Sequence, residues 1–223
     1  FNILNVEYFE ETIENKKYFI QAKISKTDTG VAITNKNEVY LWGVYEGQKN
    51  TLNKLENNII SNNIISFDIH DYKCLFINTS KQVYLYDISS STNSPTPCKD
   101  SDGNTIEKAT NVLINKNKMY IFVEPESNNN VEYYYRENSS DTQDITFNKN
   151  TFQIYENTHP IKVIAGSEYT GYLDNLHNLF ISGKMRKTFS DGVQSYIPLF
   201  DNGYKKINDI NTNVMNVKGG EDF

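Results

Sequence analysis

The sequence predicts an all-β fold, a β-propeller built from repeated short strands. A phrase of aliphatic and aromatic residues, best seen in Val39-Tyr40-Leu41-Trp42-Gly43, recurs at 83–86, 119–122 and 179–183. Each copy follows an apolar strand and a polar turn, and no helical period of useful length is present. Such recurrence is typical of stacked β units, which usually form binding surfaces. The alternative, a β-sandwich, would not carry the same phrase in each strand.

The first copy follows a polar lead-in segment, residues 1–17. Strands are predicted at 18–24, 31–33 and 39–42, because these runs are rich in β-branched and aromatic residues. Turn residues separate them, and Gly43 ends the last strand.

The second and third copies repeat this order with less glycine. In the second copy, strands are predicted around 64–69, 74–77 and 83–86. In the third copy, apolar residues at 112–114 precede the phrase at 119–122. The third copy is short and contains no glycine, which indicates a degenerate unit.

The fourth copy, residues 161–183, is the clearest, and a fifth begins at Val214 and stops within the unit. The equivalent aromatic positions Tyr40, Tyr84, Tyr120 and Phe180 are 44, 36 and 60 residues apart. This variation indicates a constant unit with loops of different length. The longest insertion, 124–150, is nearly all polar and is predicted to be a protruding or mobile loop, with an extra strand at 131–135.

Composition and charge exclude several classes of function. The net charge is −6 and the chain contains two arginines, Arg136 and Arg186, so a nucleic-acid surface is not expected. No apolar stretch is long enough to span a membrane. The excess of Asn, Lys, Ile, Tyr and Phe indicates an AT-rich genome. The alternative, a prion-like segment, is disfavoured because the Asn residues are scattered.

The two cysteines indicate a reducing, intracellular compartment, either the cytoplasm or the nucleus. Cys74 lies in an apolar run, where a buried free thiol is expected, and Cys98 lies in a proline-rich segment. A disulfide between them is the alternative, but two cysteines do not make a disulfide framework.

The sequence contains no motif that predicts a catalytic residue, a metal site or a cofactor. His70-Asp71 is not accompanied by a nucleophile motif, and the three histidines and two cysteines lack zinc-site spacing. No glycine-rich loop has the pattern of a phosphate-binding loop. The paired acids Glu10-Glu11 and Glu124/Glu126 are interpreted as surface carboxylates.

One dense basic segment is the best candidate for partner binding. Lys184, Arg186 and Lys187, followed by Phe189, are predicted to lie in a loop after the strand that ends at Gly183. Loops at strand ends of repeat scaffolds often carry function. The segment is therefore predicted to contact an acidic partner or a phosphate, and a solvated loop is the alternative.

The fourth copy resembles the blade motif of the regulator-of-chromosome-condensation family. The resemblance rests on Ala165-Gly166 with the phrase ending at Gly183, on Trp42-Gly43 in the first copy, and on Gly219-Gly220 in the fifth. It covers residues 18–223 and implies part of a seven-bladed propeller with four-stranded blades. It also implies structural roles for Trp42 and the motif glycines, since glycine permits close backbone approach between packed blades.

These features predict a non-enzymatic interaction module or scaffold with a protein partner. The resemblance implies an alternative function, a guanine-nucleotide exchange factor for a Ran-like small GTPase. The expected protein partner is accordingly a small GTPase or a larger assembly. A hydrolase or lyase ranks behind both, since no acid–base constellation is present.

Overall fold

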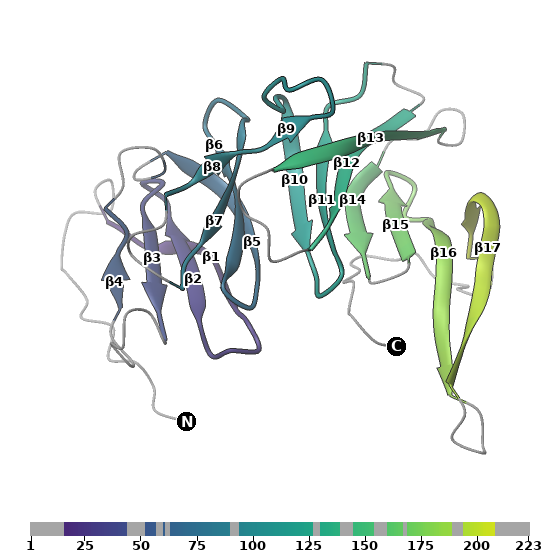
Figure 1. The fold of residues 1–223 in the computed structure, drawn as a ribbon, viewed down its shortest axis with the longest axis horizontal. Coiled ribbons are helices and arrows are strands. Elements are labelled where there is room, and N and C mark those ends of the chain that lie inside the picture. Colours follow the sequence, from purple (N-terminus) through teal and green to yellow (C-terminus); the bar gives the residue numbers. More distant parts are fainter. Residues whose placement is uncertain are drawn as a thin grey trace.

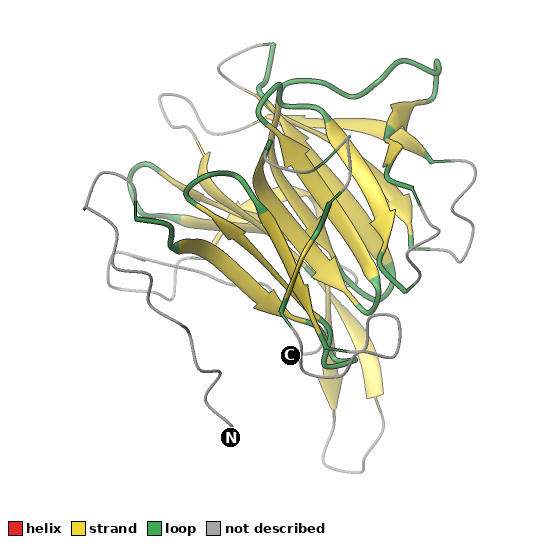
Figure 2. Ribbon diagram, turned by 90° about the vertical axis from the view of Figure 1, so that its left-hand side faces the viewer, coloured by secondary structure: helices red, strands yellow, loops and turns green. Residues whose placement is uncertain are grey.

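The computed structural model describes residues 16–43, 52–56, 60, 63–89, 94–126, 130–138, 145–153, 160–166, 169–188 and 194–207. Within these ranges the regular secondary structure consists of β-strands without helices (Figure 2), which confirms the all-β prediction. The same ranges contain no helix that is long and apolar enough to cross a membrane.

The strands form four sheets, which follow one another in chain order (Figure 1) and which we call blades 1 to 4. Blade 1 contains β1 (Phe19–Ile24), β2 (Gly30–Thr34), β3 (Val39–Trp42) and β4 (Asn53–Lys54). Blade 2 contains β5 (Ile64–His70), β6 (Lys73–Asn78), β7 (Val83–Asp87) and β8 (Thr96–Pro97). Blade 3 contains β10 (Ala109–Ile114), β11 (Lys118–Val123), β12 (Asn130–Glu137) and β13 (Thr146–Gln153), with β9 (Lys99–Asp100) parallel to β13. Blade 4 contains β14 (Pro160–Ala165), β15 (Tyr169–Asp174), β16 (Leu179–Thr188) and β17 (Gln194–Lys206).

A β-bulge recurs at the same place in the first strand of every blade. The register shifts by one residue at Ile20, Ile65, Thr110 and Ile161, and all four bulged residues are exposed. At a bulge the extra residue is left without a partner in the ladder of the neighbouring strand. The bulge therefore provides a common origin for aligning the four blades.

This alignment shows that the predicted repeat is wrong in blade 3. Residues 119–122 lie in β11, the second strand, whereas the phrase forms the third strand in the other blades. By register, the blade 3 equivalent of Tyr40, Tyr84 and Phe180 is Tyr134. These four positions are 44, 50 and 46 residues apart. The repeat is therefore more regular than the strand phrase suggested.

The same correction applies to the polar insertion at 124–150. The strand predicted at 131–135 is confirmed as part of β12, but the loop expected around it is wrong for the rest of β12 and for the part of β13 within this range. These two strands are the third and fourth strands of blade 3. Pairing with β11 and β13 stabilises β12, whose residues Tyr133 and Tyr134 pack into the cores on opposite faces of the blade.

Three apolar cores hold neighbouring blades together. Two are largely aliphatic, one between blades 1 and 2 around Phe76 and one between blades 2 and 3 around Phe147. The third, between blades 3 and 4, is mainly aromatic and contains Tyr120, Phe122, Tyr133, Tyr172 and Phe180 with Val131 and Val163. The Tyr172 and Phe180 rings of this core are stacked, with their centres 4.7 Å apart.

Polar bonds also cross between blades. The buried carboxylate of Asp68 accepts a bond from Lys23 of blade 1 and one from the Ile114 N–H of blade 3, at 2.9 Å. The side-chain amide of Asn115 donates to the Gly166 carbonyl of blade 4, at 2.8 Å. Because buried bonds of this kind are costly to break, the blades form a rigid scaffold.

A buried glutamate is paired with a partly exposed lysine at equivalent places in blades 1 and 3. Lys54 Nζ lies 2.8 Å from Glu38 Oε1, and Lys149 Nζ lies 3.0 Å from Glu132 Oε2. Burial by itself would raise the pKa of Glu132, but bonds from the Glu126 N–H and the Lys149 ammonium outweigh it and lower the pKa. Burial of Glu38 is likewise outweighed by bonds from two lysines, so its pKa is also lowered.

We expect Glu132→Gln to lower the free energy of unfolding at pH 7 by about 1–3 kcal/mol, because a charge-assisted bond is lost. A carboxyl whose folded pKa is lowered stabilises the fold above its unfolded pKa and loses this effect as pH falls through the folded pKa. The variant should therefore lose less stability than the wild type between pH 6 and pH 3. Urea unfolding across this range measures both effects.

Glu137→Gln is the control, since Glu137 lies on the same strand, is exposed, and is 4.0 Å from Lys118. It should change stability by no more than about 0.5 kcal/mol. Equal pH dependence in wild type and Glu132→Gln would contradict the role of the Glu132 pair.

Both cysteines are free and buried. The buried free thiol predicted at Cys74 is confirmed, and the alternative of a disulfide with Cys98 is wrong in this structure. Burial raises the pKa of both thiols, so neither is an activated nucleophile.

Candidate functional site

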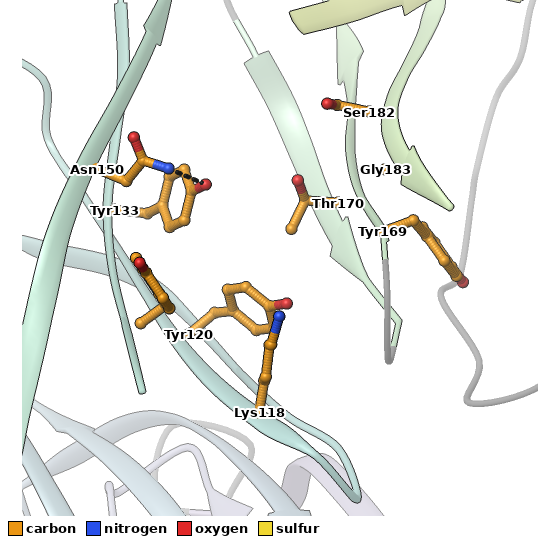
Figure 3. A pocket seen from close by; sticks show the side chains of 9 residues that line it. Lys118, Tyr120, Tyr133, Asn150, Tyr169, Thr170, Ser182 and Gly183 are labelled. Atoms are coloured by element: carbon orange, nitrogen blue, oxygen red, sulfur yellow. Dashed lines mark hydrogen bonds between the residues drawn. The ribbon is translucent and has the colours of Figure 1, made fainter. Parts of the chain in front are cut away.

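A pocket of about 250 Å³ lies between blades 3 and 4. Figure 3 shows its two walls facing each other. The blade 3 wall consists of Lys118, Tyr120, Tyr133, Tyr135 and Asn150, and the blade 4 wall consists of Tyr169, Thr170, Ser182 and Gly183. The pocket is therefore a gap in the aromatic interface of these two blades.

The blade 3 wall is a patch of tyrosine rings. Tyr133 and Tyr135 lie on one side of β12 because side chains alternate along a strand, and Tyr120 on β11 is paired with Tyr135. The ring centre of Tyr133 is 6.2 Å from those of Tyr120 and Tyr135. The Asn150 side chain donates a hydrogen bond of 2.7 Å to the Tyr133 hydroxyl and holds this ring in place.

The blade 4 wall is built from small polar residues on two paired strands. Thr170 on β15 is opposite Ser182 on β16, and Tyr169 is opposite Gly183. Tyr169 lies against Gly166, where a Cβ atom would be 2.1 Å from its ring. The bond from Asn115 to the Gly166 carbonyl joins this end of blade 4 to blade 3.

The strand register explains why the pocket exists. The pair Thr170–Ser182 is equivalent to Gly30–Trp42 in blade 1, to Cys74–Tyr86 in blade 2 and to Met119–Arg136 in blade 3. The Trp42 ring lies against Gly30, and the Tyr86 ring is buried in the core between blades 1 and 2. In blade 4 this position holds serine. A missing large side chain leaves a space that neighbours fill only partly.

The pocket carries one positive charge and many hydroxyl groups. Among the described residues that line it, Lys118 is the one basic side chain, and the others supply tyrosine, threonine and serine hydroxyls and one amide. Lys118 Nζ also lies 4.0 Å from Oε1 of Glu137 on β12. These groups can form hydrogen bonds with a bound partner.

The predicted basic segment begins beside this pocket, but the loop predicted for it is wrong. Lys184, Arg186 and Lys187 lie on β16, which continues past the pocket residue Gly183 and pairs there with β17 alone. Figure 1 shows the β16–β17 hairpin projecting beyond the rest of blade 4. Phe189 lies outside the described residues.

The described residues of the family motif lie either at the end of the third strand of a blade or beside the pocket. Trp42 is half-buried and contacts Gly30 of its own blade, and Gly43 follows it with φ of 98°. In blade 4 the equivalent of Gly43 is Gly183, which has φ of 114° and lines the pocket. Gly166 lies against the ring of the pocket residue Tyr169. Gly219 and Gly220 lie outside the described residues.

The other polar candidates do not gather into a site. His70 Nε2 lies 3.4 Å from Asp71 Oδ2 at the turn between β5 and β6. No group of three or more His, Cys, Asp or Glu residues in the described part of the chain is placed to hold a metal ion.

The pocket tyrosines were missed by the sequence analysis. Three of them lie on β11 and β12, the strands whose places in the repeat were wrongly assigned. One signal was present: the phrase Phe180-Ile181-Ser182-Gly183 has serine where Val39-Tyr40-Leu41-Trp42-Gly43 has tryptophan.

No family model matches the chain, and no curated protein matches its sequence. Its structure is similar to that of Prp20p from Saccharomyces cerevisiae, described with its binding to Gsp1p and histones, with a TM-score of 0.62 and 15% identity. The match covers 92% of this chain and 55% of that one.

Two further solved structures give the same result. Yeast RCC1 (Prp20) bound to Kap60 has a TM-score of 0.62 at 13% identity, over 92% of this chain and 53% of that one. Human WBSCR16 has a TM-score of 0.60 at 12% identity, over 92% and 56%. The chain spans little more than half the length of each protein, and the fold is an RCC1-type β-propeller. The predicted resemblance is confirmed at the level of the fold.

Proposed function

We propose that this chain is a non-enzymatic protein-interaction module, and that a partner protein docks at the pocket between blades 3 and 4. The observation that carries the proposal is the pocket itself, a preformed, tyrosine-lined gap at a blade interface. Tyrosine is enriched at protein interfaces because its ring provides apolar contact while its hydroxyl bonds to polar groups.

The rigidity of the scaffold supports this proposal. Each pocket wall is part of a paired sheet, and the bond from Asn115 to the Gly166 carbonyl links the two blades beside the pocket. A partner that binds such a preformed site pays little to order it. The basic residues of β16 begin at the pocket edge and favour an acidic partner by charge attraction.

Filling the pocket tests the proposal. The double variant Thr170→Gly/Ser182→Trp recreates the Gly30–Trp42 pair of blade 1, where a Cβ on Gly30 would be 1.9 Å from the Trp42 ring. We expect the filled protein to stay folded and to bind an identified partner at least about tenfold more weakly, which corresponds to about 1.4 kcal/mol. The partner is identified by affinity capture from a native extract and its binding is then measured with purified proteins.

Lys36→Ala is the control, because Lys36 is exposed at a turn of blade 1 and does not line the pocket. It should bind the partner as the wild type does, with unchanged thermal unfolding. Equal binding by the wild type and by the folded double variant would place the docking site elsewhere on the propeller.

The alternative is a guanine-nucleotide exchange factor, in which the chain would stabilise a nucleotide-free small GTPase. The similarity to Prp20p, which is described as binding Gsp1p, favours it. It predicts faster release of a fluorescent guanine nucleotide from a Ran-like GTPase when micromolar chain is added. Release at the uncatalysed rate, for this chain and for the longest protein that contains it, would eliminate this alternative.

A further inference from the structure

We infer that the pocket between blades 3 and 4 accepts an aromatic side chain, of the size of tryptophan, from an acidic segment of the partner. This inference rests on the proposed function and names the chemistry that the docking site recognises. It is argued from the repeat register, from the walls of the pocket and from the charge around it.

The repeat register indicates the shape of the missing group. At the positions equivalent to Ser182, blade 1 has Trp42, blade 2 has Tyr86 and blade 3 has Arg136. The chain itself thus supplies a large ring at this place in two blades. In blade 4 the small Ser182 side chain leaves this space unfilled by the chain itself. An aromatic ring of a partner that entered the pocket would occupy the position that Trp42 occupies in blade 1.

The walls of the pocket suit an aromatic ring better than an aliphatic one. Tyr120, Tyr133 and Tyr135 present ring faces and edges, and aromatic pairs gain about 0.5–1.5 kcal/mol beyond their area burial. The hydroxyls of Thr170 and Ser182 on the opposite wall are acceptors for an indole N–H. The volume of about 250 Å³ is below the usual range of small-molecule sites, roughly 300–1,000 Å³, and is suited to a single side chain.

The charge around the pocket indicates the flanking residues of the partner. Lys118 lines the pocket and lies 4.0 Å from Glu137, and beyond the pocket residue Gly183 the chain continues along β16 through Lys184, Arg186 and Lys187. The protein as a whole has a net charge of −6, so this run of basic residues differs from the average of the chain. Acidic residues on either side of the aromatic anchor would be attracted to it and repelled elsewhere.

The test uses two acetylated and amidated peptides, Glu-Asp-Trp-Asp-Glu and the same peptide with Ala for Trp. Each is titrated into the ¹⁵N-labelled 223-residue chain and followed by amide chemical shifts. We expect the tryptophan peptide to shift the signals of Thr170, Ser182 and Tyr133, and the alanine peptide to bind at least about tenfold more weakly. The folded double variant Thr170→Gly/Ser182→Trp should show no such shifts, whereas Lys36→Ala, at an exposed turn of blade 1, should bind like the wild type.

A third peptide, Lys-Lys-Trp-Lys-Lys, tests the charge, and Lys118→Gln should weaken binding of the acidic peptide at low salt. Equal binding of the tryptophan and alanine peptides, or equal binding of the acidic and basic peptides, would overturn the inference. If the filled variant loses the partner but no tryptophan peptide binds the wild type, the inference fails while the proposed function stands. If the partner binds the filled variant normally, the proposed docking site fails whatever the peptides do.

Discussion

Replacing Asp68 by alanine is expected to lower the free energy of unfolding by about 2–4 kcal/mol. Asp68 is 7% exposed and joins three blades, since one carboxylate oxygen accepts from Lys23 and the other from the Ile114 N–H. Its removal leaves the Ile114 N–H buried without an acceptor. Lys23 is exposed enough to be solvated again, which limits the cost.

Urea unfolding at pH 7 measures this effect, with Asp102→Ala as the control. Asp102 is exposed, so its loss should cost no more than about 0.5 kcal/mol. Asp68→Asn keeps one carbonyl acceptor, so its free energy of unfolding should lie between those of the wild type and the alanine variant. A cost below 1 kcal/mol for Asp68→Ala would show that the bonds of Asp68 do not hold the blades together.

Replacing Gly43 by alanine is expected to cost about 2–4 kcal/mol. Gly43 has φ of 98°, a conformation that side chains rarely adopt, and a Cβ there would lie 2.2 Å from the backbone oxygen of Asp28. Because the obstacle is backbone, it cannot be relieved by a change of rotamer, and the end of β3 must separate from the turn between β1 and β2. This is the physical reason for glycine at the end of the repeated phrase.

The variant Gly103→Ala measures the cost of a positive φ without the steric clash that a Cβ atom makes at position 43. Gly103 also has a positive φ, 85°, but a Cβ there would meet no atom within 4 Å. We expect a cost of about 1 kcal/mol, which reflects backbone strain alone. If both variants lost the same stability, close approach to Asp28 would not be the reason for glycine at position 43.

Much of the fold could be predicted because strand signals are local. The alternation of buried and half-buried residues in Val39–Trp42 follows from a period of two. The polar residues that follow each second strand in blades 1, 2 and 4 form tight turns. In these turns Thr34, Asn78 and Asp174 accept backbone N–H bonds at equivalent positions. Such signals lie within a few residues of one another and need no tertiary contact.

Blade 3 shows where local signals fail. The strand of residues 119–122 has the composition of the repeated phrase, but β10 and β11 are joined by a turn as short as those that precede the phrase in other blades. Hydrophobicity cannot distinguish a second from a third strand when both are buried on two faces. The pairing of Tyr133 with Phe122 and of Tyr134 with Lys149 settles the assignment.

The candidate site could be predicted only in part for the same reason. The basic run at 184–187 was recognised from charge alone, but its place on β16 next to the pocket depends on the pairing of β16 with β15 and β17. Tyr120, Tyr133 and Tyr169 come from three strands, 49 residues apart from first to last in the chain. Blade packing brings them to one gap.

By itself, the sequence determined that this protein is all-β, repeated, acidic and of RCC1-type propeller fold. The hydrophobic period, the turn residues and a short motif each depend on a few neighbouring residues, so they can be recognised without a structure. The tertiary structure alone decided which strand of blade 3 carries the repeat, where the buried glutamates and Asp68 find their partners, and that Ser182 leaves a tyrosine-lined pocket. These features arise from contacts between sheets, and a contact between distant residues is not encoded in the pattern of either segment alone.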